Sequence, residues 1–382
     1  MKSSTSVKAI AATTLAFVLA LAPAAHATTW KAGGASSVNN LMAACKSDYQ
    51  KTTGDDFPYN GTGSGDGKKG LHAGTLDFAF SDSVDTAPMD GEIHLPAFVW
   101  PVGILVNMGA DQRGINLSTK TIAGIFSGEI TNWNDKQIFA DNNQTVEEVI
   151  YKTKKNGKVK MTKAGAPKIL RTVERTLHHT LPNKKITVYY RTKNSGTSNN
   201  LTRALNVLEP TIWPKSANDS FATSFPGDIT RLASTFRGAA GSGDVANGVK
   251  STPWSITYDE VGFAEAPYNL TIASVINAAG KSVQPSSESA MAAAAEATVA
   301  SNGTVTFDYK NTSPAAYPFT ATTYALALTN YGDKTKASGI KNTLDYLANN
   351  CAKNNPAQGF GAYSAANAFS LAFASQLAKL GS

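Results

Sequence analysis

Cysteine is scarce in this sequence: its 382 residues include only Cys45 and Cys351. A scaffold held together by many disulfides is therefore excluded. Charged residues are also few, at 16%, whereas 42% of the residues are hydrophobic, which argues against a disordered chain. A chain of this length usually forms two or three domains of about 100 to 200 residues each. The composition therefore predicts a globular protein with one large core or two smaller ones.

Long apolar runs are also lacking after residue 27, because no later stretch reaches the about 20 apolar residues that a membrane span needs. Residues 1–27 have the features of a secretory signal peptide. Lys2 and Lys8 precede an apolar run over 11–25, and Ala25 and Ala27 provide a cleavage signal. A retained membrane anchor is the alternative, but the run is too short for one. We expect cleavage after Ala27 and a soluble protein in the periplasm, or secreted beyond it.

The two cysteines lie in the mature chain, where an oxidising compartment allows them to pair. A Cys45–Cys351 bridge would join the two ends of the chain and contribute about 4 to 5 kcal/mol in the chain-entropy model. Two buried free thiols are the alternative. Neither cysteine has a histidine close to it in sequence, which argues against a catalytic thiol.

Short β-branched and aromatic runs alternate with helical patterns, which is typical of an α/β protein. Helices are predicted over residues 36–50, 118–128, 284–300, 334–353 and 363–380. Strands are predicted over 57–62, 76–80, 98–107 and 322–328. In the last helix, five apolar residues are expected to share one packing face: Phe369, Leu371, Phe373, Leu377 and Leu380.

A basic segment lies in the middle of the chain. Residues 149–163 alternate around Asn156 and Gly157, which predicts a hairpin, and residues 152–175 contain seven Lys and two Arg but a single acid, Glu174. One interpretation is a solvated hairpin face. The other is a positive surface that attracts anions toward a cleft. Nucleic-acid binding is not expected, because the segment lacks interleaved aromatic residues.

Four short segments place glycine or small hydroxyl residues where a loop enters a helix. Glycine allows backbone N–H groups to approach a ligand, and the first turn of a helix presents unpaired donors and a partial positive charge. Such segments together form an anion site, to which an arginine adds a bidentate donor. Each segment alone could be a simple cap or turn. The four segments cover residues 33–37, 61–65, 81–83 and 191–197.

Asp82 is unexpected in an anion site, because a carboxylate repels a bound anion. It is explained if the ligand carries a proton that the carboxylate accepts, as phosphate does and sulfate at neutral pH does not. Rejection of an unprotonated ligand then gives specificity. A helix cap is the alternative role of Asp82.

These segments, in this order, resemble the phosphate-binding proteins of the high-affinity ABC uptake system, including the DING proteins. The resemblance covers nearly all of the mature chain, with further landmarks over residues 125–135 and 322–324. It implies a type II periplasmic-binding-protein fold, with two α/β lobes and a ligand cleft between them. It also implies inorganic phosphate as ligand, a membrane ABC permease as partner, a monomer, and no cofactor.

The resemblance also assigns roles to residues. Asp82 accepts the phosphate proton and Arg191 supplies the bidentate donor. The remaining residues would donate hydroxyl or N–H groups: Ser36, Ser37, Ser64, Ser195, Gly196 and Thr197.

By the same resemblance, residues 28–107 and 318–382 form lobe I, and residues 108–317 form lobe II with a basic insertion near 149–175. Cys45 and Cys351 would then lie in one lobe. Two positions depart from the family: Lys193 stands where an acid usually holds the arginine, and Ser37 stands where an aromatic is common. Either another acid orients Arg191, or the site is more positive.

An enzyme, such as a secreted phosphatase that uses Ser64 or Ser195, is the main rival. A serine nucleophile needs a base, and a metal-assisted reaction needs a ligand cluster. The four histidines of the mature chain match no HxH or HExxH pattern, so neither catalysis nor a metal site is expected: His72, His94, His178 and His179. A binder of another tetrahedral oxyanion is the second rival, and Asp82 argues against it.

Overall fold

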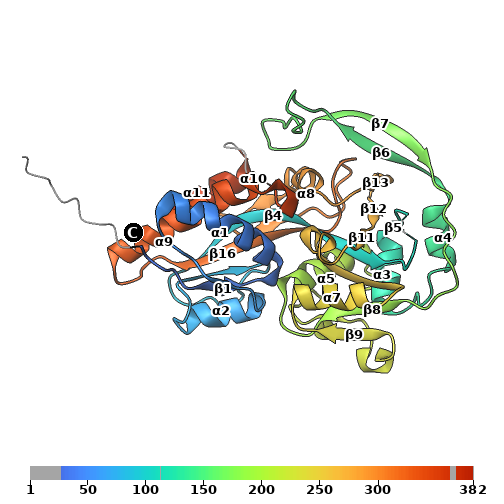
Figure 1. Ribbon diagram of the computed structural model, residues 1–382, viewed down its shortest axis with the longest axis horizontal. Helices are drawn as coiled ribbons and strands as arrows, with labels where there is room; N and C mark the ends of the chain where they lie inside the picture. Colours follow the sequence, from blue (N-terminus) through green and yellow to red (C-terminus); the bar gives the residue numbers. More distant parts are fainter. Residues whose placement is uncertain (1–26, 112, 362–366, 382) are drawn as a thin grey trace, which may run out of the picture.

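The structure, a computed structural model, describes residues 27–111, 113–361 and 367–381. A long mixed sheet runs through both halves of the molecule (Figure 1). Its strands, in spatial order, are β2 (Tyr59–Asn60), β1 (Ala32–Gly34), β3 (Phe78–Ser81), β16 (Thr320–Leu328), β4 (Glu92–Asn107), β10 (Ser255–Glu260), β8 (Thr187–Arg191) and β9 (Phe236–Ala239), with β11 (Thr271–Ile272) also paired to β4.

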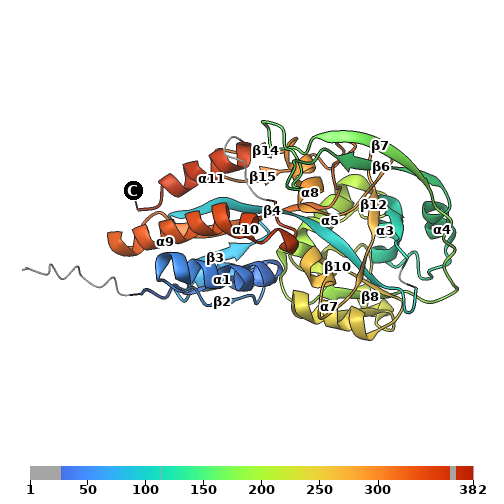
Figure 2. The same cartoon turned by 45° about the horizontal axis from the view of Figure 1, so that its top comes forward.

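Strand β4 connects the two halves, because it changes its neighbour along its length. Residues 92–101 pair with β16 in one half, and residues 102–107 pair with β10 in the other. Figure 2 shows β4 passing from the half that contains α1 and α9 to the half that contains α3 and α7. Its continuous burial explains the near-continuous apolar sequence, since both faces of a central strand are covered. The division of the chain at residues 107 and 318 remains a prediction.

The first half is covered by helices from both ends of the chain. They are α1 (Asn39–Thr53), which follows the short helix η1 (Ser36–Val38), α2 (Ser64–His72), α9 (Lys334–Tyr346), the π-helical turn η4 (Leu347–Cys351), α10 (Ala352–Asn354), η5 (Pro356–Gln358) and α11 (Ala368–Ala378). A disulfide joins Cys45 of α1 to Cys351 of η4, with the Cα atoms 5.4 Å apart. The bridge thereby ties a helix near the start of the chain to a turn of helix near its end.

The second half contains the remaining helices: α3 (Thr119–Ser127), α4 (Lys136–Asn142), α5 (Gly196–Leu208), α6 (Phe221–Ser224), η2 (Ile229–Leu232), α7 (Ser242–Ser251), η3 (Val261–Ala264) and α8 (Ser287–Ala294). Helix α3 forms where local signals predict it. The Ser118 side chain accepts a hydrogen bond from the N–H of Thr121, and Gly128 ends the helix with φ 82°, a conformation that glycine adopts at little cost. No helix in the described ranges is long and apolar enough to cross a membrane.

A second sheet carries the basic hairpin. Its order is β5 (Asn116–Ser118), β12 (Ser274–Ile276), β13 (Lys281–Val283), β6 (Thr145–Tyr151) and β7 (Ile169–Thr176), and a separate pair joins β14 (Thr298–Val299) to β15 (Val305–Thr306). The predicted turn is present, since Gly157 has φ 79° and Thr153 bridges Val159. The prediction of the strands was only partly correct, because β6 pairs with β7 beyond residue 163. All nine basic residues of 152–175 are exposed.

Two helix predictions need correction. Leu371 does not share the packing face of α11, since it is 63% exposed while Phe369, Phe373 and Leu377 are buried. At 3.6 residues per turn, a residue two positions from Phe369 points to the opposite side of the helix. The helix predicted over 284–300 is confined to α8, because it begins at the Ser286 cap and gives way to turns and the strand β14.

Candidate functional site

The eight predicted site residues are all buried, and most of them meet where the two halves of the molecule face each other. The seven with side chains beyond hydrogen are between 0 and 3% exposed. Ser36, Ser37, Ser64 and Asp82 come from the first half, and Arg191, Ser195, Gly196 and Thr197 from the second. The segments that were expected to form one anion site thus lie at one place.

Asp82 follows β3 and is surrounded by hydroxyl groups. Ser37 Oγ donates to both carboxylate oxygens at 2.9 Å, Thr323 Oγ1 donates to Oδ1 at 2.6 Å, and Thr197 Oγ1 donates to Oδ2 at 3.3 Å. Burial raises the pKa of Asp82 to about 6, although these hydroxyls and the charge of Arg191 oppose the rise. The carboxylate is therefore ionised at neutral pH and can accept a proton near that pH.

Arg191, at the end of β8, crosses from one half to the other. Its Nε donates to the carbonyl of Ala240 at 2.8 Å, and its Nη1 donates to Ser36 Oγ at 2.9 Å and to Ser242 Oγ at 3.2 Å. Its Nη2 is buried and has no hydrogen-bond partner among the residues that the structure describes. A buried guanidinium N–H without an acceptor is costly, so this atom is a donor available to an anion.

A buried acid on β10, Asp259, lies near Arg191, whereas the position two residues after Arg191 holds a lysine. Lys193 occupies that position and instead pairs with Asp66 at 3.3 Å on the surface. Burial raises the pKa of Asp259 on β10 to about 7, and the charge of Arg191 and a hydrogen bond from Ser242 oppose the rise. The charges of Asp259 and Arg191 therefore act on each other, although no hydrogen bond joins the two side chains within the described part of the chain.

Two helices begin at the site and supply backbone donors. Ser64, the first residue of α2, accepts hydrogen bonds at Oγ from the N–H groups of Asp82 at 3.1 Å and Gly196 at 3.2 Å. Gly196 is the first residue of α5, and a Cβ there would lie 2.6 Å from Asp82 Cβ. Ser195 is committed to capping α5, since its hydroxyl accepts from the N–H of Ser198 at 3.3 Å.

Sequence reasoning missed three contributors: Ser242, Thr323 and Asp259. Ser242 contacts Ser36 and Arg191, and it begins α7 after Gly241. A glycine and a serine at the start of a helix is the same signal that marked the other segments, so Ser242 could have been found. Thr323 falls within the landmark stretch 322–324, but no role at the site was assigned to it. Asp259 lies within a buried strand, and nothing in its local sequence distinguishes it from other strand residues.

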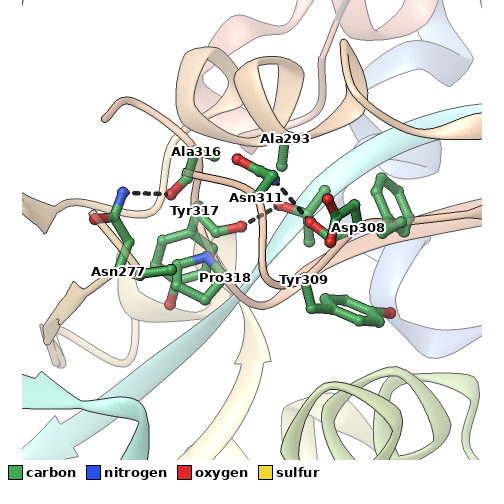
Figure 3. A pocket seen from close by; sticks show the side chains of 11 residues that line it. Asn277, Ala293, Asp308, Tyr309, Asn311, Ala316, Tyr317 and Pro318 are labelled. Atoms are coloured by element: carbon green, nitrogen blue, oxygen red, sulfur yellow. Dashed lines mark hydrogen bonds between the residues drawn. The ribbon is translucent and has the colours of Figure 1, made fainter. Parts of the chain in front are cut away.

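A cleft of about 350 Å³ opens beside Asp82 and leads outward between the two halves. Its wall combines polar side chains, such as Asn199 and Arg203, with apolar and aromatic ones, such as Val305 and Phe307. A second cavity, between Asn277 and Tyr309 (Figure 3), shares Phe307 and Tyr309 with this cleft, and its volume is only about 10 Å³. That volume is enough for about one water molecule, so it is no ligand pocket.

The arrangement offers hydrogen-bond donors and acceptors to a small anion. The Ser64 hydroxyl receives its hydrogen bonds from backbone N–H groups and has no general base among its hydrogen-bond partners in the described ranges. A buried guanidinium, a buried carboxylate and several hydroxyls converge instead. Together they match a small anion that both accepts and donates hydrogen bonds.

Known proteins resemble this chain in sequence and in fold. The family described as a PBP superfamily domain matches residues 21–350. Phosphate-binding protein PstS of Xylella fastidiosa is 29% identical over 319 residues, which span 82% of this chain and 75% of that protein. Phosphate-binding protein PstS of Pasteurella multocida is 31% identical over 280 residues, which span 71% and 67%.

Among solved structures, a human phosphate binding apolipoprotein has a TM-score of 0.63 to this chain. The match covers 91% of this chain and 93% of the human one, at 21% sequence identity. At that identity the likeness concerns the fold alone.

Proposed function

This chain belongs to the PBP superfamily, and we propose that it captures inorganic phosphate and delivers it to a membrane ABC permease. The predicted type II periplasmic-binding-protein fold is confirmed, since the α/β architecture matches that of phosphate-binding proteins along nearly the whole chain. Both PstS relatives carry the name phosphate-binding protein. We assign the two halves joined by β4 to the two lobes of this fold, and we place the protein in the periplasm.

One observation carries the proposal: a buried arginine and a buried aspartate face the same site. Phosphate at neutral pH has negative charge for Arg191 and a proton for Asp82, so it satisfies both groups at once. Isothermal titration of the mature protein with phosphate tests it directly. We expect about one phosphate per chain, with micromolar or tighter affinity. The absence of any heat of binding under these conditions would contradict the proposal.

Selectivity against sulfate should depend on the protonation of Asp82. Its pKa of about 6 means that the carboxylate is ionised above pH 6 and repels an unprotonated dianion. Sulfate should bind only to the protonated form, so its affinity should fall about tenfold per pH unit between pH 6 and 8 and level off below pH 6. Phosphate brings its own proton and should lose far less affinity over this range.

Asp82→Asn tests this role of the carboxylate, since an amide neither ionises nor repels sulfate. It should bind sulfate with little dependence on pH, whereas Asp90→Asn, at an exposed position, should behave like the wild type. Titrations at pH 5, 6, 7 and 8 provide the comparison. Equal sulfate affinity of the wild type at pH 6 and pH 8 would exclude this role for Asp82.

Closure of the two lobes requires glycine at position 196. A Cβ on Gly196 would lie 2.6 Å from Asp82 Cβ and 2.7 Å from Ser64 Oγ, and both of these residues belong to the opposite lobe. Gly196→Ala should therefore hold the lobes apart and weaken phosphate binding at least about tenfold, a loss of about 1.4 kcal/mol. Each lobe should still fold, because the clash lies between them.

The control for this variant is Gly114→Ala, because an added Cβ at Gly114 has no neighbour within 4 Å. Titration measures the affinity, and small-angle X-ray scattering with phosphate measures the closure. Wild-type affinity in Gly196→Ala would show that closure does not bring these residues together.

A further inference from the structure

A cluster of metal-binding side chains lies outside the phosphate site. His72, Asp85 and Glu92 each offer one ligand atom, and these atoms lie within 4.8 Å of one another. His72 ends α2, Asp85 lies in the loop after β3, and Glu92 begins β4. The three residues form no short sequence motif, which is why the sequence led us to expect no metal site.

The distances within the cluster are close to those of a bound metal. His72 Nε2 lies 2.8 Å from Glu92 Oε2 and 3.2 Å from Asp85 Oδ2. A zinc ion with ligands at about 2.0 to 2.2 Å in tetrahedral geometry separates its ligand atoms by about 3.3 Å. Small rotations of the side chains would therefore admit an ion among the three.

Buried oxygen atoms in the cluster lack hydrogen-bond donors. Asp85 is 8% exposed and the Glu92 side chain is 0% exposed, yet Asp85 Oδ2 and Glu92 Oε1 receive no hydrogen bond from any residue of the described ranges. Buried carboxylate oxygens without a donor cost free energy unless a cation compensates them. One imidazole proton between two carboxylates supplies only part of this compensation.

The neighbouring histidine does not supply the missing proton. His94 Nε2 accepts a hydrogen bond from the N–H of Asp85 at 3.0 Å, so this nitrogen has no proton for either carboxylate. It lies 3.8 Å from Glu92 Oε1, beyond a hydrogen bond. A cavity of about 260 Å³ adjoins Asp85, Glu92 and His94 and leaves room for a water ligand.

We propose that His72, Asp85 and Glu92 bind a divalent transition-metal ion, with Zn²⁺ the best match to one imidazole and two carboxylates. A dication balances the two carboxylate charges and uses the buried oxygens. The ion would tie the last turn of α2 to the loop after β3. Because Ser64 begins α2 and Asp82 begins that loop, the ion would hold in place two elements that also serve the phosphate site. The proposal does not depend on phosphate binding.

Titration of the untagged mature protein with Zn²⁺ in phosphate-free buffer tests the site. We expect about one tight site per chain and a rise in Tm that a chelator reverses. His72→Gln and Glu92→Gln should each weaken Zn²⁺ binding at least about tenfold and remove the rise in Tm. His178→Gln, which changes an exposed histidine outside the cluster, should leave both unchanged.

Circular dichroism without metal establishes whether each variant is folded. If His72→Gln or Glu92→Gln does not fold, Asp85→Asn replaces it in the titration. The proposal is overturned if the wild type shows no Zn²⁺ binding at micromolar concentrations. It is equally overturned if folded His72→Gln and Glu92→Gln bind Zn²⁺ as tightly as the wild type.

Discussion

Arg191→Met is expected to weaken phosphate binding by about 100-fold to 10,000-fold. A hydrogen bond to a charged group contributes about 1.5 to 3 kcal/mol, and a guanidinium can give two to one anion. With 1.4 kcal/mol per factor of ten, two such bonds correspond to about this range. Nη2 of Arg191 is buried and has no acceptor in the part of the chain that the structure describes, so we expect the anion to accept its hydrogen bond.

The loss of Arg191 has a second effect on the same site. Asp82 and Asp259 both lose the positive charge that lowers their pKa. Where these carboxylates remain ionised, they repel phosphate more strongly than in the wild type. We therefore expect the loss of phosphate affinity in Arg191→Met to be close to 10,000-fold at pH 8 and smaller at pH 5.5.

The matched control is Arg231→Met, which removes an arginine whose side chain is 84% exposed. It should keep wild-type affinity, because an exposed charge is screened by solvent and salt. Isothermal titration at pH 5.5 and pH 8 gives the phosphate affinities of each variant. Methionine is chosen because its long unbranched side chain fills the space of the arginine. A loss of less than tenfold in Arg191→Met would mean that phosphate binds elsewhere.

Removal of the disulfide is expected to lower the free energy of unfolding by about 3 to 5 kcal/mol. The bridge connects residues separated by 306 positions and joins α1 to η4. In the chain-entropy model, a cross-link that closes so long a loop strongly restricts the unfolded chain. Both cysteines are buried, at 1% and 0% exposure, so Cys45→Ala with Cys351→Ala removes little beyond the bridge.

Urea unfolding of the double variant and of the wild type, each with and without dithiothreitol, measures this contribution. Reductant should destabilise the wild type by a similar amount and leave the double variant unchanged. Phosphate affinity should persist in the folded variant, because neither cysteine touches the phosphate site. Equal stability of the oxidised wild type and the double variant would show that the bridge has no thermodynamic role.

Elements with strong local signals could be predicted from the sequence. The Ser118 cap and Gly128 bound α3 as expected, and the apolar run that ends at Asn107 lies in a central strand. The predictions failed where tertiary packing determines which side chains are buried and which strands pair. Leu371 has the same polarity as its buried neighbours but points to solvent. The turn at Gly157 is local, whereas the pairing of β6 with β7 depends on contacts across a long loop.

The sequence by itself predicted which segments would come together at the proposed phosphate site, because glycines and hydroxyls at helix starts have a local signature. It also identified Asp82 and Arg191 as its two charged groups. Only the tertiary structure decided how these groups are held. Thr323 reaches Asp82 from 241 residues away, and Ser242 reaches Ser36 from 206 residues away. Asp259 lies where its charge acts on Arg191, and His72 meets Asp85 and Glu92. Such partners come from separate strands and helices, and no short stretch of sequence records which elements fold against each other.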